Sequence, residues 1–300
     1  MTGKEKALAA IRQNRKNAEI QHRALLDTLR ADETFDTLFR TENALKWDFI
    51  KARTDEEKNG IEVSIQKNIV AMNNYLSLIG YSEKALMVPY SCKLCNDTGM
   101  IDGKECSCVD TIRIALSLQE NPLLASCPFG FNDVTFSYYK EEQGEKEKIA
   151  RAVEKGLANG KKYFLFAGKP GTGKTFLASA AVKGLLREGR DVVAMNAIKW
   201  NKKMLEYHCA PLEGKKSIWQ IFEDADVLLI DDLGAEQVLN NVTIPYLLEM
   251  LTERTDKITF ITTNLSPADL EKRYGQRILS RLLDKNLSMP ILFEGKDLRF

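Results

Sequence analysis

The stretch that decides the fold is Tyr163–Thr175, which reads YFLFAGKPGTGKT. Its first five residues are apolar and have the length of a buried strand. The next eight, Gly168–Thr175, match the pattern G-x-x-x-x-G-K-[ST], and a helical stretch follows as far as Leu186. A glycine loop between a strand and a helix turns backbone N–H groups and the positive end of the helix dipole toward one point, a geometry that binds phosphate. The sequence therefore predicts a nucleotide site here.

The parts of this loop have distinct predicted roles. Lys174 is expected to reach the β- and γ-phosphates of a nucleotide, and the Thr175 hydroxyl to ligate Mg²⁺. The residues expected to contact the nucleotide are the loop and its successor: Gly168, Lys169, Pro170, Gly171, Thr172, Gly173, Lys174, Thr175 and Phe176. ATP or ADP, together with Mg²⁺, is the predicted ligand.

The rest of the fold is predicted from apolar runs on either side of this loop. Four more runs of strand length, separated mostly by helical segments, lie at residues 191–195, 227–230, 258–263 and 290–293. Strands that alternate with helices favour a parallel sheet with helices on both faces. The predicted fold class is α/β, with a five-stranded parallel sheet.

Polar residues follow two of these runs. Asp231 and Asp232 come directly after one strand, and Asn264 after another. Because parallel strands end at the same edge of a sheet, Asp231 is expected to hold Mg²⁺ beside Thr175, and Asp232 to orient or deprotonate the attacking water. Asn264 is expected to bond the γ-phosphate or that water. The alternatives are a simple turn for the two acids and a helix cap for Asn264.

Two arginines, Arg277 and Arg281, lie four positions apart and therefore on one face of a predicted helix. Such a pair usually makes surface salt bridges. Its position after the strand that ends at Asn264 also suits an arginine finger, which stabilises transition-state charge in a neighbouring subunit's site.

Together these motifs resemble the AAA+ ATPases. The run Ala225–Gly234 (ADVLLIDDLG), the strand end Thr262–Asn264 and the segment Gly275–Leu282 (GQRILSRL) are similar, more narrowly, to bacterial helicase loaders of the DnaC/DnaI type and to the related IstB transposition helpers. The resemblance covers about residues 125–300. It implies a Walker A loop, a Walker B acidic pair, a sensor 1 asparagine and a finger that acts on a neighbouring copy. The implied catalytic residues are, in that order, Lys174, Asp231, Asp232, Asn264, Arg281 and Arg277.

Two details depart from many AAA+ proteins. Asp232 stands where a glutamate is common, and its shorter side chain suits slow, switch-like hydrolysis. Few residues follow Arg281, too few for the helical lid that completes many such sites, and a lidless core is similar to the loader group. The tail Gly295–Arg299 resembles one in which an arginine replaces sensor 2, so Arg299 is a candidate nucleotide contact. A merely charged terminus is the alternative.

Four cysteines form two close pairs ahead of the ATPase region: Cys92, Cys95, Cys106 and Cys108. Two such pairs on turns can supply four thiolates to one tetrahedral zinc ion, which would be structural because no coordination position stays open. A redox CxxC pair and an iron–sulfur centre are the competing interpretations. The isolated Cys127 and Cys209 are predicted to be small buried hydrophobes.

Residues 1–115 are predicted to form a separate domain that combines helices with the zinc module. Apolar residues recur at steps of three and four from Ile61 to Ile79, which is typical of one helix face, and a second amphipathic helix covers Phe35–Phe49. Turn-forming residues mark 116–139 as a linker, and residues 140–300 are the predicted ATPase domain.

The charge balance limits the partners. The 43 basic and 42 acidic residues leave a net charge of +1, which excludes a polycation that coats nucleic acid. A local cluster of Lys199, Lys202 and Lys203 around Trp200, with Lys215–Lys216 in the next loop, favours at most a weak contact with single-stranded DNA; a core position for Trp200 is the alternative. The sequence contains neither a membrane-spanning apolar run nor an apolar signal core, so a cytoplasmic, nucleoid-associated protein without membrane contact is expected.

These features lead to one expected function. The resemblance implies an ATPase that loads the hexameric replicative helicase onto single-stranded DNA, with the zinc-bearing domain on the helicase and ATP between copies of the chain. The zinc module argues against the alternative, an IstB-like helper of DNA transposition. A P-loop metabolite kinase and a zinc interaction module that does not hydrolyse ATP are more distant alternatives.

Overall fold

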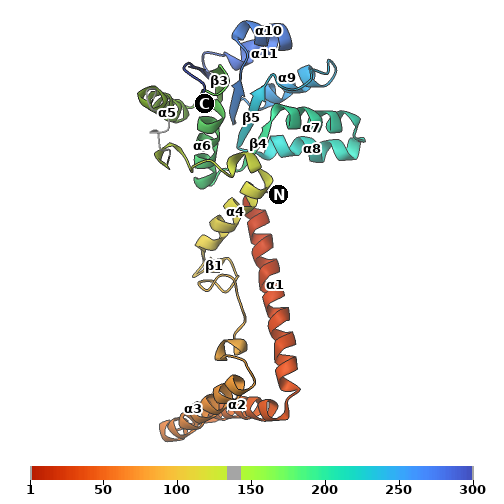
Figure 1. The fold of residues 1–300 in the computed structure, drawn as a ribbon. Helices are drawn as coiled ribbons and strands as arrows, with labels where there is room; N and C mark the ends of the chain where they lie inside the picture. Colours follow the sequence, from red (N-terminus) through yellow and green to blue (C-terminus); the bar gives the residue numbers. More distant parts are fainter. Residues whose placement is uncertain (1, 134–142, 299–300) are drawn as a thin grey trace. The chain divides into compact units, whose positions relative to one another are not determined.

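The computed structural model describes residues 2–133 and 143–298, which fall into two units (Figure 1). One unit is Glu5–Val109, and the other consists of Met1–Lys4 and Asp110–Phe300. Both this division and the boundary predicted after residue 115 fall within helix α4 (Ser107–Glu120). The last part of the predicted linker, residues 134–139, lies outside the described residues.

The Glu5–Val109 unit consists of helices and a short hairpin. Its elements are α1 (Gly3–Arg30), α2 (Glu33–Lys51), α3 (Asp55–Leu78), the 3-10 helix η1 (Glu83–Leu86), β1 (Met100–Ile101) and β2 (Lys104–Glu105). The two helices predicted from apolar periodicity, α2 and α3, pack together around Phe35, Met72 and Leu76. Asp32 caps the start of α2 and accepts a hydrogen bond from the Tyr75 hydroxyl of α3 at 2.8 Å, so a polar contact also joins the two helices.

The other unit is built on a five-stranded sheet. Its strands are β3 (Tyr163–Gly168), β4 (Val192–Asn196), β5 (Val227–Leu233), β6 (Ile258–Thr263) and β7 (Ser288–Phe293). They pair in the order β4-β5-β6-β3-β7, and every pair is parallel. This confirms the predicted α/β fold class. Because β3, β6 and β5 are neighbours, their carboxyl ends meet at one edge of the sheet.

Helices cover both faces of this sheet (Figure 1). They are α4, η2 (Pro122–Leu124), η3 (Phe131–Asp133), α5 (Gln143–Ala158), α6 (Lys174–Arg187), α7 (Ala197–Cys209), α8 (Leu212–Asp224), α9 (Thr243–Glu253), α10 (Pro267–Tyr274) and α11 (Gln276–Leu282). Phe164 and Phe166 of β3 belong to the core formed with α5 and α6, whereas Tyr163 and Leu165 belong to the core formed with α7 to α11. This alternation is the period of two that a strand imposes. The described residues after β7, 294–298, are not helical.

Within the described part of the chain, no helix combines the length and the apolar character that crossing a bilayer requires.

Arg254 connects the end of α8 to the starts of β5 and β6, and this contact gives a prediction about stability. Its buried guanidinium donates hydrogen bonds to the carbonyls of Ala225 (2.8 Å), Ile258 (3.0 Å) and Phe222, and burial lowers the pKa of Arg254 to about 10. Because Arg254→Ala removes a donor that three carbonyls share, we expect it to lower the free energy of unfolding by about 3 kcal/mol in urea titrations. Arg151→Ala, at a guanidinium that is 80% exposed, is the control and should change it by less than about 0.5 kcal/mol. Equal losses in the two variants would contradict this role.

Candidate functional site

The glycine loop joins β3 to α6 as the sequence predicts. Lys174 is the first residue of α6, and Gly173 before it has a left-handed φ of 89°. Gly171 has a φ of 76°, and a Cβ atom at this position would lie 1.8 Å from Oδ1 of Asp297. Since a side chain would meet that carboxylate and strain the backbone, glycine is required at this turn of the loop.

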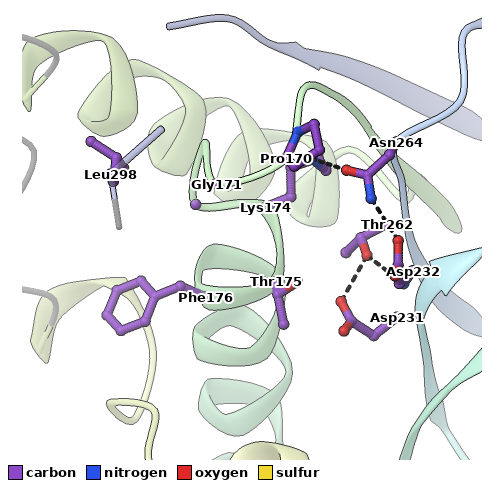
Figure 2. Close-up of a pocket in the computed structure, with 11 residues that line it drawn as sticks. Pro170, Gly171, Lys174, Thr175, Phe176, Asp231, Asp232, Thr262, Asn264 and Leu298 are labelled. Atoms are coloured by element: carbon purple, nitrogen blue, oxygen red, sulfur yellow. Dashed lines mark hydrogen bonds between the residues drawn. The ribbon is translucent and has the colours of Figure 1, made fainter. Parts of the chain in front are cut away.

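A pocket of about 660 Å³ opens at this edge of the sheet (Figure 2). It is lined by residues of the loop, the start of α6, the ends of β5 and β6, and the C-terminal tail: Pro170, Gly171, Gly173, Lys174, Thr175, Phe176, Asp231, Asp232, Thr262, Asn264 and Leu298. The structure thus brings together the side chains predicted to serve phosphate, Mg²⁺ and the attacking water. Three expected nucleotide contacts, Gly168, Lys169 and Thr172, are not among the described lining residues. The Thr172 hydroxyl instead donates to the Lys169 carbonyl at 2.9 Å and braces the loop.

The ammonium of Lys174 connects the loop to the end of β6. Its Nζ donates to the carbonyls of Gly168 (2.8 Å) and Lys169 (2.6 Å) and to Oδ1 of Asn264 (2.8 Å). The Asn264 amide in turn donates from Nδ2 to Oδ1 of Asp232 at 2.7 Å (Figure 2). One amide therefore bridges the loop lysine and the acidic pair.

Asp231 and Asp232 both reach the pocket because β5 is irregular. Neighbouring residues of a regular strand point to opposite faces. Here the β5–β6 register shifts between Ile230 and Leu233, and Asp232 has a left-handed φ of 57°, so this bulge turns both carboxylates to the same side (Figure 2). Burial raises the pKa of Asp232, the Asp231 carboxylate adds to the rise, and Lys174 opposes it.

Two lining residues were missed by the sequence reasoning. Thr262 precedes Asn264 by two positions, and side chains two positions apart along a strand point to the same side. This period of two was the signal that could have identified Thr262. Leu298 reaches the pocket from the tail, where its backbone N–H donates to the Gly171 carbonyl at 3.0 Å. No local pattern indicates this return of the chain.

A buried carboxylate supports the loop that follows the acidic pair. Glu236 is 2% exposed and accepts hydrogen bonds from the backbone N–H of Gly234 at 2.9 Å and from the Tyr274 hydroxyl. These bonds connect the chain after β5 to the end of α10. The sequence reasoning also missed this residue, because nothing in its local spacing pairs Glu236 with Tyr274.

The predicted finger arginines lie on α11, away from the pocket of their own chain. Arg277 is exposed and Arg281 is half-buried, and neither is among the described residues that line the pocket. The described pocket of one chain is therefore lined without either arginine. Arg299, predicted to replace sensor 2, lies outside the described residues.

The four predicted ligand cysteines form a second site, in the Glu5–Val109 unit. The Sγ atoms of Cys92, Cys95, Cys106 and Cys108 all lie within 4.8 Å of one another. The Cys92–Cys106 sulfurs are 3.8 Å apart and the Cys95–Cys108 sulfurs 3.6 Å. Sulfurs held about 2.3 Å from a tetrahedral zinc ion would be about 3.8 Å apart. The four thiols therefore have the chemistry and the spacing that fit zinc.

Tight turns hold these thiols in place. Asp97, with a left-handed φ of 52°, accepts hydrogen bonds from the backbone N–H groups of Ser91 (2.8 Å) and Cys92 (2.7 Å). The second cysteine pair follows the β1–β2 hairpin, whose turn Asp102–Gly103 has positive φ at both residues, as a type I′ hairpin turn requires. Backbone geometry thus brings the two pairs together.

The surroundings of Cys95 favour a thiolate. Burial opposes ionisation, but hydrogen bonds from the Gly99 backbone N–H and from the other thiols outweigh it and lower the pKa of Cys95 to about 6. Burial and the same thiol contacts raise the pKa of Cys108. A thiolate is the form that binds a metal.

The exposure of the side chains tests two further predictions, on the cluster around Trp200 and on the two isolated cysteines. Trp200 is fully buried, so the core alternative is confirmed and this ring cannot stack on a base. Lys199 and Lys202 are exposed, whereas Lys203 pairs with Glu206 at 2.6 Å. Cys209 is exposed at the end of α7, so the prediction that it is buried is wrong. Cys127 is half-buried.

The family model described as IstB-like ATP binding protein matches residues 130–289, which contain the glycine loop and four of the five strands whole. The chain belongs to the IstB-like ATP-binding protein family. This confirms the resemblance to the group of loaders and transposition helpers that the motifs indicate. The cysteine cluster lies outside the matched residues.

Similar proteins each match between half and two thirds of the chain. The chain is 26% identical to the uncharacterized protein YdaV of Escherichia coli K12 over 165 residues, which is 54% of this chain and 63% of YdaV. It is 26% identical to the replicative helicase loader DnaC of the same strain over 183 residues, which is 59% of this chain and 71% of DnaC. A crystal structure of DnaI is similar with 20% identity and a TM-score of 0.47, over 58% of this chain and 93% of that one. The chain thus spans less than two thirds of YdaV.

Proposed function

We propose that this protein is an ATP-dependent loader of the replicative DNA helicase. The observation that carries the proposal is that one chain combines the ATP pocket of the IstB-like family with a four-thiol cluster in a separate unit outside the matched residues. Similarity to DnaC, itself a replicative helicase loader, supports this choice of partner. The protein would place a hexameric helicase on single-stranded DNA during replication initiation or restart.

The pocket side chains support ATP hydrolysis. Lys174 would hold the β- and γ-phosphates, and the Thr175 hydroxyl and the Asp231 carboxylate are oxygen donors of the kind that hold Mg²⁺. When bound, Mg²⁺ neutralises charge that develops on the phosphates. Asp232 would orient or deprotonate the attacking water, and Asn264 would keep Asp232 in position. The short reach of an aspartate suits slow hydrolysis that serves as a switch.

Self-association through the ATP site is part of this proposal. Because α11 does not line the pocket of its own chain, Arg281, with Arg277 beside it, would act on ATP in a neighbouring copy. Arg299 would add a contact from the tail that also carries Leu298. ATP binding would hold the copies together and hydrolysis would release them, so chemistry would control assembly.

Residues 1–115 would bind the helicase. Zinc held by the four thiolates Cys92, Cys95, Cys106 and Cys108 would stabilise the docking surface without taking part in the reaction. Residues 1–115 would then be the helicase-binding domain and residues 140–300 the ATPase domain. DNA contact would be weak and local, through lysines such as Lys199 and Lys202, because a net charge of +1 provides no general attraction to phosphates.

An ATPase helper of DNA transposition is the second candidate, and the matched family itself favours it. Such a helper would use the same pocket but act with a transposase on duplex DNA. The cysteine cluster supports the loader, because an IstB-like helper is not expected to carry a zinc module.

The partner is tested with the full-length protein and the hexameric replicative helicase of the same organism. We expect the zinc-loaded protein to retain the helicase on an affinity resin in the presence of ATP, and at least about tenfold less helicase after zinc is chelated. Equal recovery with and without zinc would contradict the role given to the cysteine module. Failure of the zinc-loaded protein to bind the helicase, with binding to a transposase instead, would favour the second candidate.

A further inference from the structure

Thr262 of β6 contacts both members of the acidic pair. We propose that its hydroxyl is a positioning group that orients Asp231 and Asp232 for ATP hydrolysis, an inference that rests on the proposed function. Thr262 is 1% exposed, and its Oγ1 lies 2.7 Å from Oδ1 of Asp231 and 2.8 Å from the backbone nitrogen of Asp232 (Figure 2).

The direction of both hydrogen bonds follows from the chemistry of the groups. A backbone N–H can only donate, so the Thr262 oxygen accepts from Asp232. An ionised carboxylate can only accept, so the hydroxyl proton is given to Asp231. One hydroxyl therefore donates to the first acid and accepts from the second, and neither bond can be reversed.

The bond from the Asp232 N–H stabilises the bulge in β5. Asp232 adopts a left-handed φ of 57°, a conformation that costs a non-glycine residue free energy unless its surroundings hold it. The shift in register between Ile230 and Leu233 interrupts the β5–β6 ladder at this residue. The Thr262 hydroxyl replaces the missing ladder partner, and the carboxylate of Asp232 then faces Asn264.

The bond to Asp231 fixes the other carboxylate. Because Thr262 donates to Oδ1 of Asp231, β6 restrains the orientation of that carboxylate, whose remaining lone pairs would serve Mg²⁺. The proposed metal ligand and the proposed water-orienting group are thus aligned by the same atom. Loss of this hydroxyl should disturb Mg²⁺ use and turnover together, while the loop that binds the phosphates stays intact.

The test compares variants of Thr262 in the full chain. Thr262→Val keeps the shape and removes the hydroxyl, and Thr262→Ala removes it without added bulk in case valine prevents folding. For both we expect kcat for ATP to fall about 10- to 100-fold and the half-saturating Mg²⁺ concentration to rise several-fold, with ADP affinity in the absence of Mg²⁺ within about threefold of wild type. Thr262→Ser retains the hydroxyl and should restore both values to within about threefold.

Thr259→Val is the matched control. Thr259 is also buried on β6, and its hydroxyl accepts a hydrogen bond from Arg254 rather than from the acidic pair, so its loss should lower stability and leave the Mg²⁺ dependence unchanged. Wild-type kcat and Mg²⁺ dependence in Thr262→Val or Thr262→Ala would overturn the positioning role while the proposed ATPase stands. A wild-type protein that hydrolyses no ATP would instead overturn the proposed function, and this inference with it.

Discussion

Replacing Lys174 with alanine is expected to lower kcat/KM for ATP by about 1,000-fold or more. Among the described residues that line the pocket, Lys174 is the only lysine or arginine, and its side chain is largely buried, so its charge is little screened by water. Its Nζ also donates to Oδ1 of Asn264, which holds Asp232. The substitution therefore removes the proposed phosphate contact and loosens the group expected to orient the water. Because Lys174 also opposes the rise in the pKa of Asp232, its loss should raise that pKa further.

Phosphate release and nucleotide affinity are both measured for this variant. Lys148→Ala, at an exposed lysine of α5, removes the same charge elsewhere in the unit and should stay within about twofold of wild type. Lys174→Ala activity above one tenth of wild type would mean that the phosphates bind elsewhere. The same variant also distinguishes two hypotheses about function. If helicase loading persists without Lys174, the result would favour a zinc interaction module over an ATP-driven loader.

The sheet and the glycine loop could be predicted because their signals are local. A strand such as β3 is an apolar run, and the loop that follows it has a fixed pattern of glycines next to Lys174. Parallel pairing then places the ends of β3, β5 and β6 at one edge, which brought Asn264 to the acidic pair as expected. Each of these steps needs only spacing along the chain and the general geometry of parallel sheets.

The geometry within the site could not be predicted in the same way. The period of two in a strand assigns Asp231 and Asp232 to opposite faces, and only the bulge brings both to the pocket. That bulge depends on the hydroxyl of Thr262, 30 positions further along the chain. The contact of Leu298 with the loop and the pairing of Glu236 with Tyr274 are likewise long-range. Such contacts follow from tertiary packing, which no local pattern encodes.

Removal of zinc is expected to unfold the cysteine module. The strands β1 and β2 have two residues each and their side chains are exposed, so the hairpin buries little apolar surface of its own. Asp97 and Asp102 hold left-handed backbone conformations that need support from their surroundings. A structural zinc ion in a small domain contributes about 10–16 kcal/mol, which is more than such a hairpin can supply without the metal. We therefore expect one zinc per chain, and loss of ordered structure in this module on chelation or in Cys106→Ser.

Metal analysis, amide hydrogen exchange and ATPase rate together test this expectation. Cys106→Ser, at a thiol that is 3% exposed, should lose zinc and protection from exchange in residues 91–109 but keep ATP turnover within about threefold, because the pocket belongs to the other unit. Cys209→Ser, at an exposed cysteine of α7, is the control and should keep the full zinc content. Iron with visible absorption would indicate an iron–sulfur centre instead, and a mass two units lower without metal would indicate a disulfide. Because the three outcomes leave different metals, masses and exchange patterns, one preparation of each variant distinguishes a structural zinc from its competitors.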